Sequence, residues 1–162
     1  MSVFKSQFTR AINAYKSDDA IIPNPALFVK SGTNTDTDGF RLIDDSAEFI
    51  SFSKVYPGDV VYNNLTQQSA TVVQVQSEVS LLLNADIFLY NDEPYSIYNM
   101  SPQANIGNTG CNLYIGGAGT VNVVTIGGDI VNFLSVPSGT TLPIQVRQLV
   151  ASTTATSVLA LW

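Results

Sequence analysis

Histidine is absent from this chain of 162 residues, and cysteine occurs once, at position 111. Without histidine the protein has no Ser–His–Asp or Cys–His catalytic pair, no imidazole acid or base, and no zinc site that includes histidine. A lone Cys111 forms neither an intramolecular disulfide nor a cysteine-based metal cluster. We therefore expect a protein that is not an enzyme and that has no catalytic residues, no bound metal and no cofactor.

Charge is also scarce: 12% of the residues are charged, with 7 Lys and Arg against 13 Asp and Glu, a formal net charge of −6. Binding to duplex nucleic acid needs clustered Lys and Arg, so we expect no nucleic-acid partner. No segment reaches the roughly 18 apolar residues of a membrane span, and the first residues lack the apolar core of a signal peptide. The sequence therefore predicts a folded protein that is made and kept soluble, with no membrane association.

Residues 1–25 are expected to form a short helix followed by an extended arm. Phe4, Phe8, Ile12 and Tyr15 recur at offsets of four, eight and eleven, which places them on one face of a helix. Two prolines separated by one residue then favour a stiff, extended connector. This combination predicts an arm that docks on a neighbouring subunit or another partner; a helix packed on its own domain is the alternative.

Residues 26–99 alternate short segments rich in Val, Ile, Phe and Tyr with turn residues. Such regular spacing is typical of a small β-barrel or β-sandwich, and we assign this part as the first globular domain. The expected strands are 26–30, 48–52, 59–63, 70–76, 80–83 and 95–99.

Residues 100–162 form the second expected domain, a C-terminal β-sandwich that begins with a polar linker at 100–110. Gly127-Gly128 predicts a tight hairpin of type I′, in which both central residues have positive φ. Together the two parts predict an all-β fold preceded by the N-terminal helix. The expected strands of the second domain are 112–115, 120–126, 129–136, 142–150 and 157–162.

From residue 101 onward the only charged side chains are Asp129 and Arg147. The segments 120–126 and 130–136 carry apolar residues on both faces, whereas a sheet with one wet face alternates more cleanly. Because the cores of subunit interfaces are poor in Lys, Glu and Asp, this pattern predicts a homo-oligomer held by the C-terminal domain. We expect a trimer or a pentamer, although the pattern does not define the number of copies. A plain sandwich whose outer face is rich in Ser, Thr and Asn is the alternative.

The segment from Asn34 to Asp45 has the spacing of a calcium-binding loop. Oxygen-bearing side chains lie at its positions one, three, five and twelve, and Gly39 lies at position six. The segment lacks the usual first Asp, the closing Glu and the flanking helices. We therefore expect a turn between strands instead of a metal site.

Adjacent acids occur at Asp18-Asp19, Asp44-Asp45 and Asp92-Glu93. Neighbouring side chains on a strand point to opposite faces, so these doublets make poor catalytic pairs and are expected to be solubilising turn residues. The glycine-rich run 116–119 has neither a following helix nor the Lys-Ser/Thr that would hold a phosphate.

Cys111 precedes an expected strand, with no cation nearby to lower its pKa, and it is expected to be a small buried residue. Four tyrosines could line a sugar-binding surface, since aromatic faces stack on sugars, and packing in the core and rim explains them equally well. They are Tyr90, Tyr95, Tyr98 and Tyr114.

The C-terminal pattern of strands and turns resembles a domain that recurs in virion proteins of tailed phages. It is similar to the end of the head-spike base proteins of gene transfer agents and their phage relatives. The match covers about 50 residues and includes no catalytic signature. Residues 57–63 (PGDVVYN) resemble small β-barrel modules of phage structural proteins more weakly. The matching segments are 112–116 (NLYIG), 119–128 (GTVNVVTIGG), 131–133 (VNF), 136–139 (VPSG), 142–144 (LPI) and 158–162 (VLALW).

The resemblance implies attachment to a capsid and oligomerisation, with the virion as the protein's location. We therefore expect a structural protein that decorates or caps the phage head, or forms the base of a spike, with itself and the major capsid protein or other virion proteins as partners. A neck or tail component is the nearest alternative. A carbohydrate-binding module or host-receptor adhesin is the alternative from another functional class.

Overall fold

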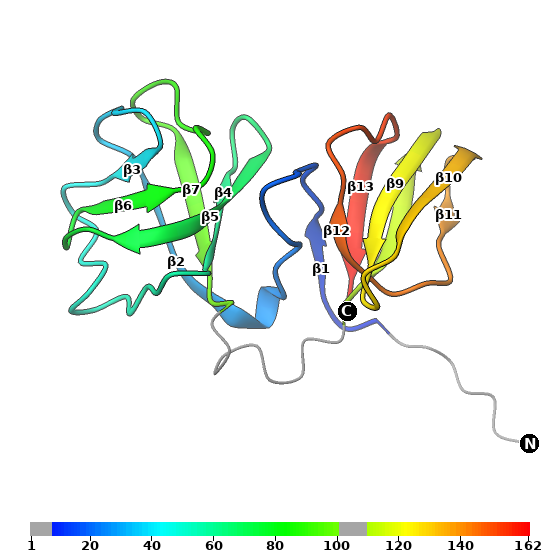
Figure 1. The fold of residues 1–162 in the computed structure, drawn as a ribbon, viewed down its shortest axis with the longest axis horizontal. Coiled ribbons are helices and arrows are strands. Elements are labelled where there is room, and N and C mark those ends of the chain that lie inside the picture. The colour runs from blue at the N-terminus through cyan, green and yellow to red at the C-terminus, as the bar shows by residue number, and fades with distance from the viewer. Residues whose placement is uncertain (1–7, 101–109) are drawn as a thin grey trace, which may run out of the picture.

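The computed structural model describes residues 8–100 and 110–162, and in these ranges the protein is all-β, as the sequence predicts. Two lobes lie side by side, one built from residues 26–99 and the other mainly from residues 110–162 (Figure 1). No sheet in the described ranges closes into a barrel. No helix among these residues is long and apolar enough to cross a membrane.

The first lobe is one open, antiparallel six-stranded sheet. A short 3-10 helix, η1 (Pro25–Leu27), leads into it, and the Asn24 side chain caps that turn by accepting a hydrogen bond from the Ala26 N–H at 2.8 Å. Buried aliphatic and aromatic side chains such as Leu42, Leu81 and Ile97 form the core. In spatial order the strands are β2 (Phe28–Thr33), β7 (Pro94–Tyr98), β4 (Val60–Asn63), β5 (Gln68–Val75), β6 (Ser80–Leu83) and β3 (Arg41–Ile43).

The expected strand at residues 48–52 is wrong, because this segment forms a turn. The N–H groups of Phe52 and Ser53 donate to the Glu48 carbonyl, and Glu48 has a φ of 51°, which strand residues do not adopt. Phe49 is fully buried, whereas Phe52 is 79% exposed. A single aromatic anchor below the turn, and not an alternating strand face, therefore explains the apolar residues here.

The second lobe is a sandwich of two antiparallel sheets, which confirms the β-sandwich character predicted for it. Its core is aliphatic and includes Leu113, Ile115, Val121 and Val123, all fully buried. The first sheet has the order β1 (Ala11–Asn13), β13 (Thr156–Leu161), β8 (Asn112–Gly117) and β11 (Thr140–Thr141), and the second has the order β10 (Ile130–Val136), β9 (Gly119–Thr125) and β12 (Val146–Leu149).

The predicted hairpin at Gly127-Gly128 is present and joins β9 to β10, but its turn differs from type I′. Gly128 has a φ of 96° and Gly127 is not in the left-handed region. The Gly128 N–H donates to the Thr125 carbonyl at 3.0 Å, and the Thr125 N–H donates to the Asp129 carbonyl at 2.9 Å. These bonds define a three-residue loop, in which only the last residue needs positive φ.

The N-terminal helix is not shown, and the described part of that segment takes another conformation. Residues 11–13 form β1, which pairs with β13 in the register Ile12 with Ala160. Backbone hydrogen bonds with a strand compete with those of a helix, and here Ala14 also donates to Val158 at 3.0 Å. Residues 2–7 of the expected helix and 101–109 of the expected linker lie outside the described residues.

The described part of the expected arm, residues 8–25, packs on its own chain between the lobes. The side chain of Ile22 enters the core of the second lobe. Tyr15 and Ala20 join a separate cluster with Val60, Tyr62 and Tyr98 of the first. The rings of Tyr15 and Tyr62 have centroids 4.2 Å apart. This segment therefore connects the two lobes through apolar contacts with both.

Candidate functional site

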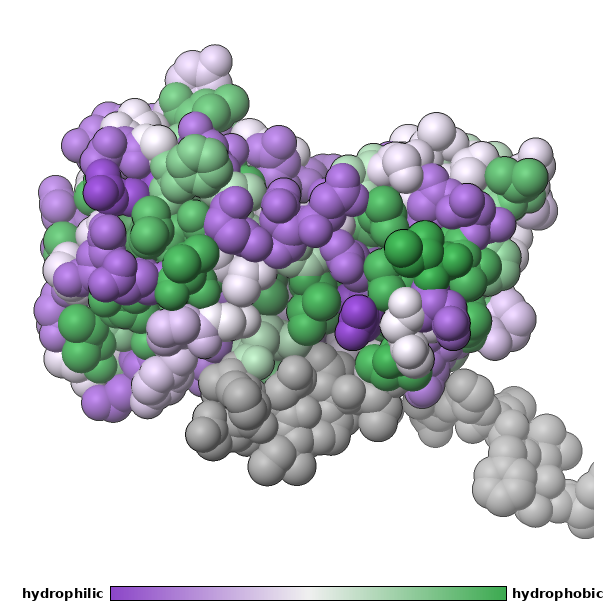
Figure 2. All heavy atoms as spheres, in the orientation of Figure 1, coloured by the Kyte–Doolittle hydropathy of each residue, from purple (hydrophilic) through white to green (hydrophobic). Residues whose placement is uncertain are grey.

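Four apolar side chains on the second lobe face away from its core. On β9, Val123 and Thr125 point inward, so Val124 between them points outward and is partly exposed. On β10, Ile130 is 77% exposed and Leu134 is 76% exposed, and Ile126 in the connecting turn is 44% exposed. Figure 2 shows hydrophobic surface gathered over the strands of this lobe. The prediction that these segments carry apolar residues on both faces is thus confirmed.

Formal charge divides sharply between the lobes. Residues 26–99 contain three Lys and Arg and ten Asp and Glu, a formal charge of −7. Residues 101–162 contain only two charged residues, Asp129 and Arg147, whose formal charges cancel. The acidic lobe and the neutral lobe therefore present different chemistry to a partner, although both expose apolar side chains, for example Phe52 on the acidic lobe.

The oxygen atoms of the candidate calcium loop are engaged elsewhere. Asn34 is fully buried, its Oδ1 accepts from the Glu93 N–H at 2.7 Å, and its Nδ2 donates to the Tyr90 carbonyl at 2.8 Å. Asp36 caps the Thr37 N–H at 2.8 Å, and Asp38 forms an ion pair with Arg41. No group of three or more His, Cys, Asp or Glu side chains among the described residues is placed to hold a metal ion.

Two of the acid doublets divide into a buried and an exposed carboxylate, so the expectation of solubilising turn residues is wrong for Asp44 and Glu93. Asp44 is buried beside the exposed Asp45, and Glu93 is buried beside the exposed Asp92. The Oε2 atom of Glu93 accepts from the Leu89 N–H at 3.0 Å, so this carboxylate anchors its own loop. Neither of these two doublets places both carboxylates on one surface.

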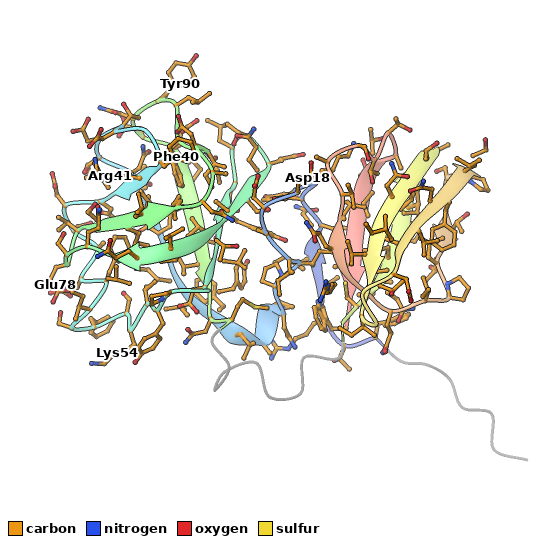
Figure 3. The ribbon with its side chains drawn as sticks, in the orientation of Figure 1. Asp18, Phe40, Arg41, Lys54, Glu78 and Tyr90 are labelled. Carbon is orange, nitrogen blue, oxygen red and sulfur yellow. The ribbon has the colours of Figure 1, made fainter. Side chains whose placement is uncertain are left out.

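Asp18 lies on the segment between the lobes, beside the second lobe (Figure 3). Its Oδ1 atom accepts from the Ala151 N–H at 3.1 Å. The next residue, Asp19, contacts the first lobe, because its carbonyl accepts from Thr71 Oγ1 at 2.9 Å and from Asn84 Nδ2 at 2.7 Å. This doublet therefore holds the two lobes together.

The glycine run and Cys111 have structural roles. A Cβ added to Gly117 would lie 1.9 Å from Thr156 Oγ1, and one added to Gly119 would lie 2.5 Å from the Ala155 nitrogen. These glycines are explained by the close approach of β13 and the turn before it. Burial raises the pKa of the Cys111 thiol to about 12, so the residue is an inert part of the core.

The four tyrosines do not share one surface. Tyr95 and Tyr98 are buried, whereas Tyr90 is 71% exposed and projects from a loop at one end of the first lobe (Figure 3). Tyr114 instead lies on the outer face of β8, where its register partners are Leu159 and Thr141. The sugar-binding surface expected from all four together is therefore not formed.

Tyr114 lines a hollow of about 530 Å³ between the lobes, which falls in the range of ligand pockets. Its walls come from the β4–β5 turn, the N-terminal segment and β13, and they carry amide, hydroxyl and ammonium groups from Gln67, Asn13, Ser157 and Lys16. Two of these wall residues, Gln67 and Ser157, have left-handed backbone conformations, with φ of 58° and 49°. The sequence pattern did not predict this hollow, because its walls come from segments far apart in the chain.

Comparison of the chain with models of protein families, with curated proteins and with solved structures finds no significant match.

Proposed function

We propose that this chain is a structural component of a tailed-phage virion, in which the neutral lobe assembles copies of the chain and the acidic lobe contacts another virion protein. The observation that carries this proposal is the division of charge between two joined all-β lobes, −7 on residues 26–99 and zero on residues 101–162. Interface cores are depleted of charge, and the neutral lobe also exposes Ile130 and Leu134. The strand and turn pattern shared with phage head-spike base proteins supports the same role.

The rigid connection between the lobes supports a scaffolding role. Residues 15–22 contribute side chains to the cores on both sides, and Gln148 of β12 donates to the Ser17 carbonyl at 2.8 Å. Ser17 Oγ in turn donates to the Ser69 carbonyl of the first lobe at 3.2 Å. A fixed angle between an assembling lobe and a partner-binding lobe suits a protein that positions one virion component on another.

Purified particles of the phage that encodes the chain test this proposal. Mass spectrometry should find the chain in particles that have been washed free of lysate, and an antibody against the acidic lobe should label them at one fixed place. Labelling at the head supports decoration or a spike base on the major capsid protein. Labelling at the neck or tail supports the nearest alternative. Absence of the chain from washed particles contradicts both.

The hollow lined by Tyr114 favours a second candidate, an adhesin that binds a host saccharide. Two aromatic residues (Tyr15 and Tyr114), the amides of Asn13 and Gln67, and hydroxyl groups on β13 are suited to a polyhydroxylated ligand. Glycan-array binding that is lost in Tyr114→Ala and retained in Tyr90→Ala would favour this candidate. Absence of glycan binding would exclude it.

A further inference from the structure

The sheet β10-β9-β12 has two edges, and the described residues cover only one of them. Along β12, the N–H groups of Ser17 and Ile22 donate to the carbonyls of Leu149 and Arg147 at 2.9 and 2.8 Å. Along β10, the other edge, no strand of the described residues is paired. The described part of the N-terminal segment therefore covers the β12 edge and not the β10 edge. We call β10 and the adjacent outer face of β9 the open side of the sheet.

The open side carries three apolar side chains, two of them next to one another. Ile130 of β10 is directly opposite Val124 of β9 in the register, and both point away from the core. Leu134 follows on the same strand, after Asn132, and is as exposed as Ile130. In a soluble monomer, neighbouring exposed aliphatic residues on a flat sheet face usually mark an interaction surface.

An amide pair lies between these apolar residues. Asn122 of β9 is opposite Asn132 of β10 in the register. Asn122 Nδ2 donates to Ser152 Oγ at 2.8 Å, but its Oδ1 is buried and has no hydrogen-bond partner among the described residues. Because this oxygen has almost no accessible surface in the single chain, an approaching molecule does not reach it, and the contact rests on the apolar side chains.

The backbone of β10 favours contact through its face and not through its edge. The register with β9 shifts between Phe133 and Val136, and Ser135 within the bulge has a φ of 52°. Bulges of this kind twist an edge strand away from further strand pairing. Side chains, and not ladder hydrogen bonds, would therefore make the contact.

The lack of net charge around this face favours a second copy of the chain as its binding partner. Residues 101–162, which carry this face, have no net charge, so two such faces approach each other without repulsion, while the −7 of each acidic lobe lies on the other side of the interlobe segment. A strongly charged partner would find no complementary side chains here, because Asp129 and Arg147 are the only charged residues beyond position 101.

We propose that copies of this chain pack against one another through the outer face of β9 and β10, with Ile130 and Leu134 buried in the contact. This inference rests on the proposed function. It assigns the contact between copies to one face of the neutral lobe. It leaves the edge of β10 and the acidic lobe outside the contact.

Light scattering on the full chain tests this face with matched variants. Ile130→Lys and Leu134→Lys place an ammonium group in the contact, and we expect each to weaken association at least about 30-fold, so that samples at 10 μM fall to the monomer mass of 17.4 kDa. Phe52→Lys is the control, because Phe52 is equally exposed, at 79%, but lies on the acidic lobe. It should keep the wild-type mass.

Thermal melts and the milder Ile130→Ser variant separate lost association from lost folding. The two lysine variants should keep a cooperative melt as monomers, since the substituted side chains are exposed in one chain, and Ile130→Ser should weaken association in the same direction. A wild-type oligomer that neither lysine variant disrupts overturns this surface and leaves the proposed function standing. A monomeric wild type overturns the assembly on which both rest.

Discussion

The hydroxyl of Tyr95 donates a hydrogen bond of 2.6 Å to Asp44, and both side chains are buried in the first lobe. Ser46 donates two further bonds to the same carboxylate, from its N–H at 2.9 Å and its hydroxyl at 2.7 Å. Burial by itself raises the pKa of Asp44, but the hydrogen bonds from Tyr95 and Ser46 outweigh it and hold the pKa below its ordinary value. The carboxylate is thus a charged acceptor that ties β7 to the loop after β3.

This lowered pKa predicts acid sensitivity of folding. A carboxyl with a lower pKa in the folded state stabilises the fold above its unfolded pKa of about 4, and that contribution is lost as the pH falls through the folded pKa. Asp44→Asn should therefore flatten the fall of the unfolding free energy below about pH 5, and should cost about 1.5–3 kcal/mol at pH 7. Urea unfolding at a series of pH values measures both, with the exposed neighbour Asp45→Asn as the control. Equal pH slopes in the wild type and Asp44→Asn would contradict this account.

Gly32 on β2 leaves the space that the Asp44–Tyr95 pair occupies. A Cβ at Gly32 would lie 2.6 Å from the Tyr95 hydroxyl oxygen and 2.8 Å from Asp44 Oδ2, so Gly32→Ala should displace the pair and destabilise the fold by about 1–3 kcal/mol. Gly127→Ala is a matched control, because its nearest neighbours would lie 3.6 and 3.7 Å from the new Cβ. Urea midpoints that shift equally in the two variants would rule out the steric explanation.

The strand pattern was predictable where the hydrophobic period was clear. Residues 80–83 match β6 at both ends, and the glycine pair at 127–128 marked the β9–β10 hairpin because few other residues adopt the required backbone. The short strands β1, β3 and β11 were missed, since two or three residues carry too little periodicity. Their pairing is decided by distant partners, such as β13 for β1.

The candidate surface was only partly predictable. The scarcity of charged residues beyond residue 101 indicated an interface, but sequence alternation alone did not show which face of the sheet other parts of the chain cover. That depends on residues 17–22 lying along β12, more than a hundred positions away in sequence. The helical period of Phe4, Phe8, Ile12 and Tyr15 was misleading at its described positions, because Tyr15 is buried by an interlobe aromatic cluster and not by a helix face.

Removal of residues 1–25 should destabilise the protein. The deletion removes β1 together with the buried side chains of Tyr15 and Ile22. Because loss of one large buried side chain costs about 2–5 kcal/mol, we expect a loss of at least about 4 kcal/mol in urea unfolding. Tyr15→Ala alone should show about half of that effect. A truncated chain with the stability of the full chain would show that this segment is dispensable for folding.

Calcium should leave the stability almost unchanged. The side chains of Asn34, Asp36 and Asp38 already have protein partners, so no open oxygen cluster remains in this loop. At 1 mM calcium, a site of about 10 μM affinity would add about 2.7 kcal/mol, a shift of several degrees in Tm. We expect less than about one degree by the same scaling. A larger shift that is lost in Asp36→Ala and absent with magnesium would identify a calcium site.

The mass of the wild-type chain in solution tests the central claim most directly, namely that the neutral lobe assembles copies of the protein. Sedimentation equilibrium between 1 and 50 μM, a range chosen to bracket about 10 μM dissociation constants, requires no variant and no partner. The account predicts a mean mass that rises with concentration from the monomer mass of 17.4 kDa towards a whole multiple of it. A single species at 17.4 kDa across the whole range would contradict it.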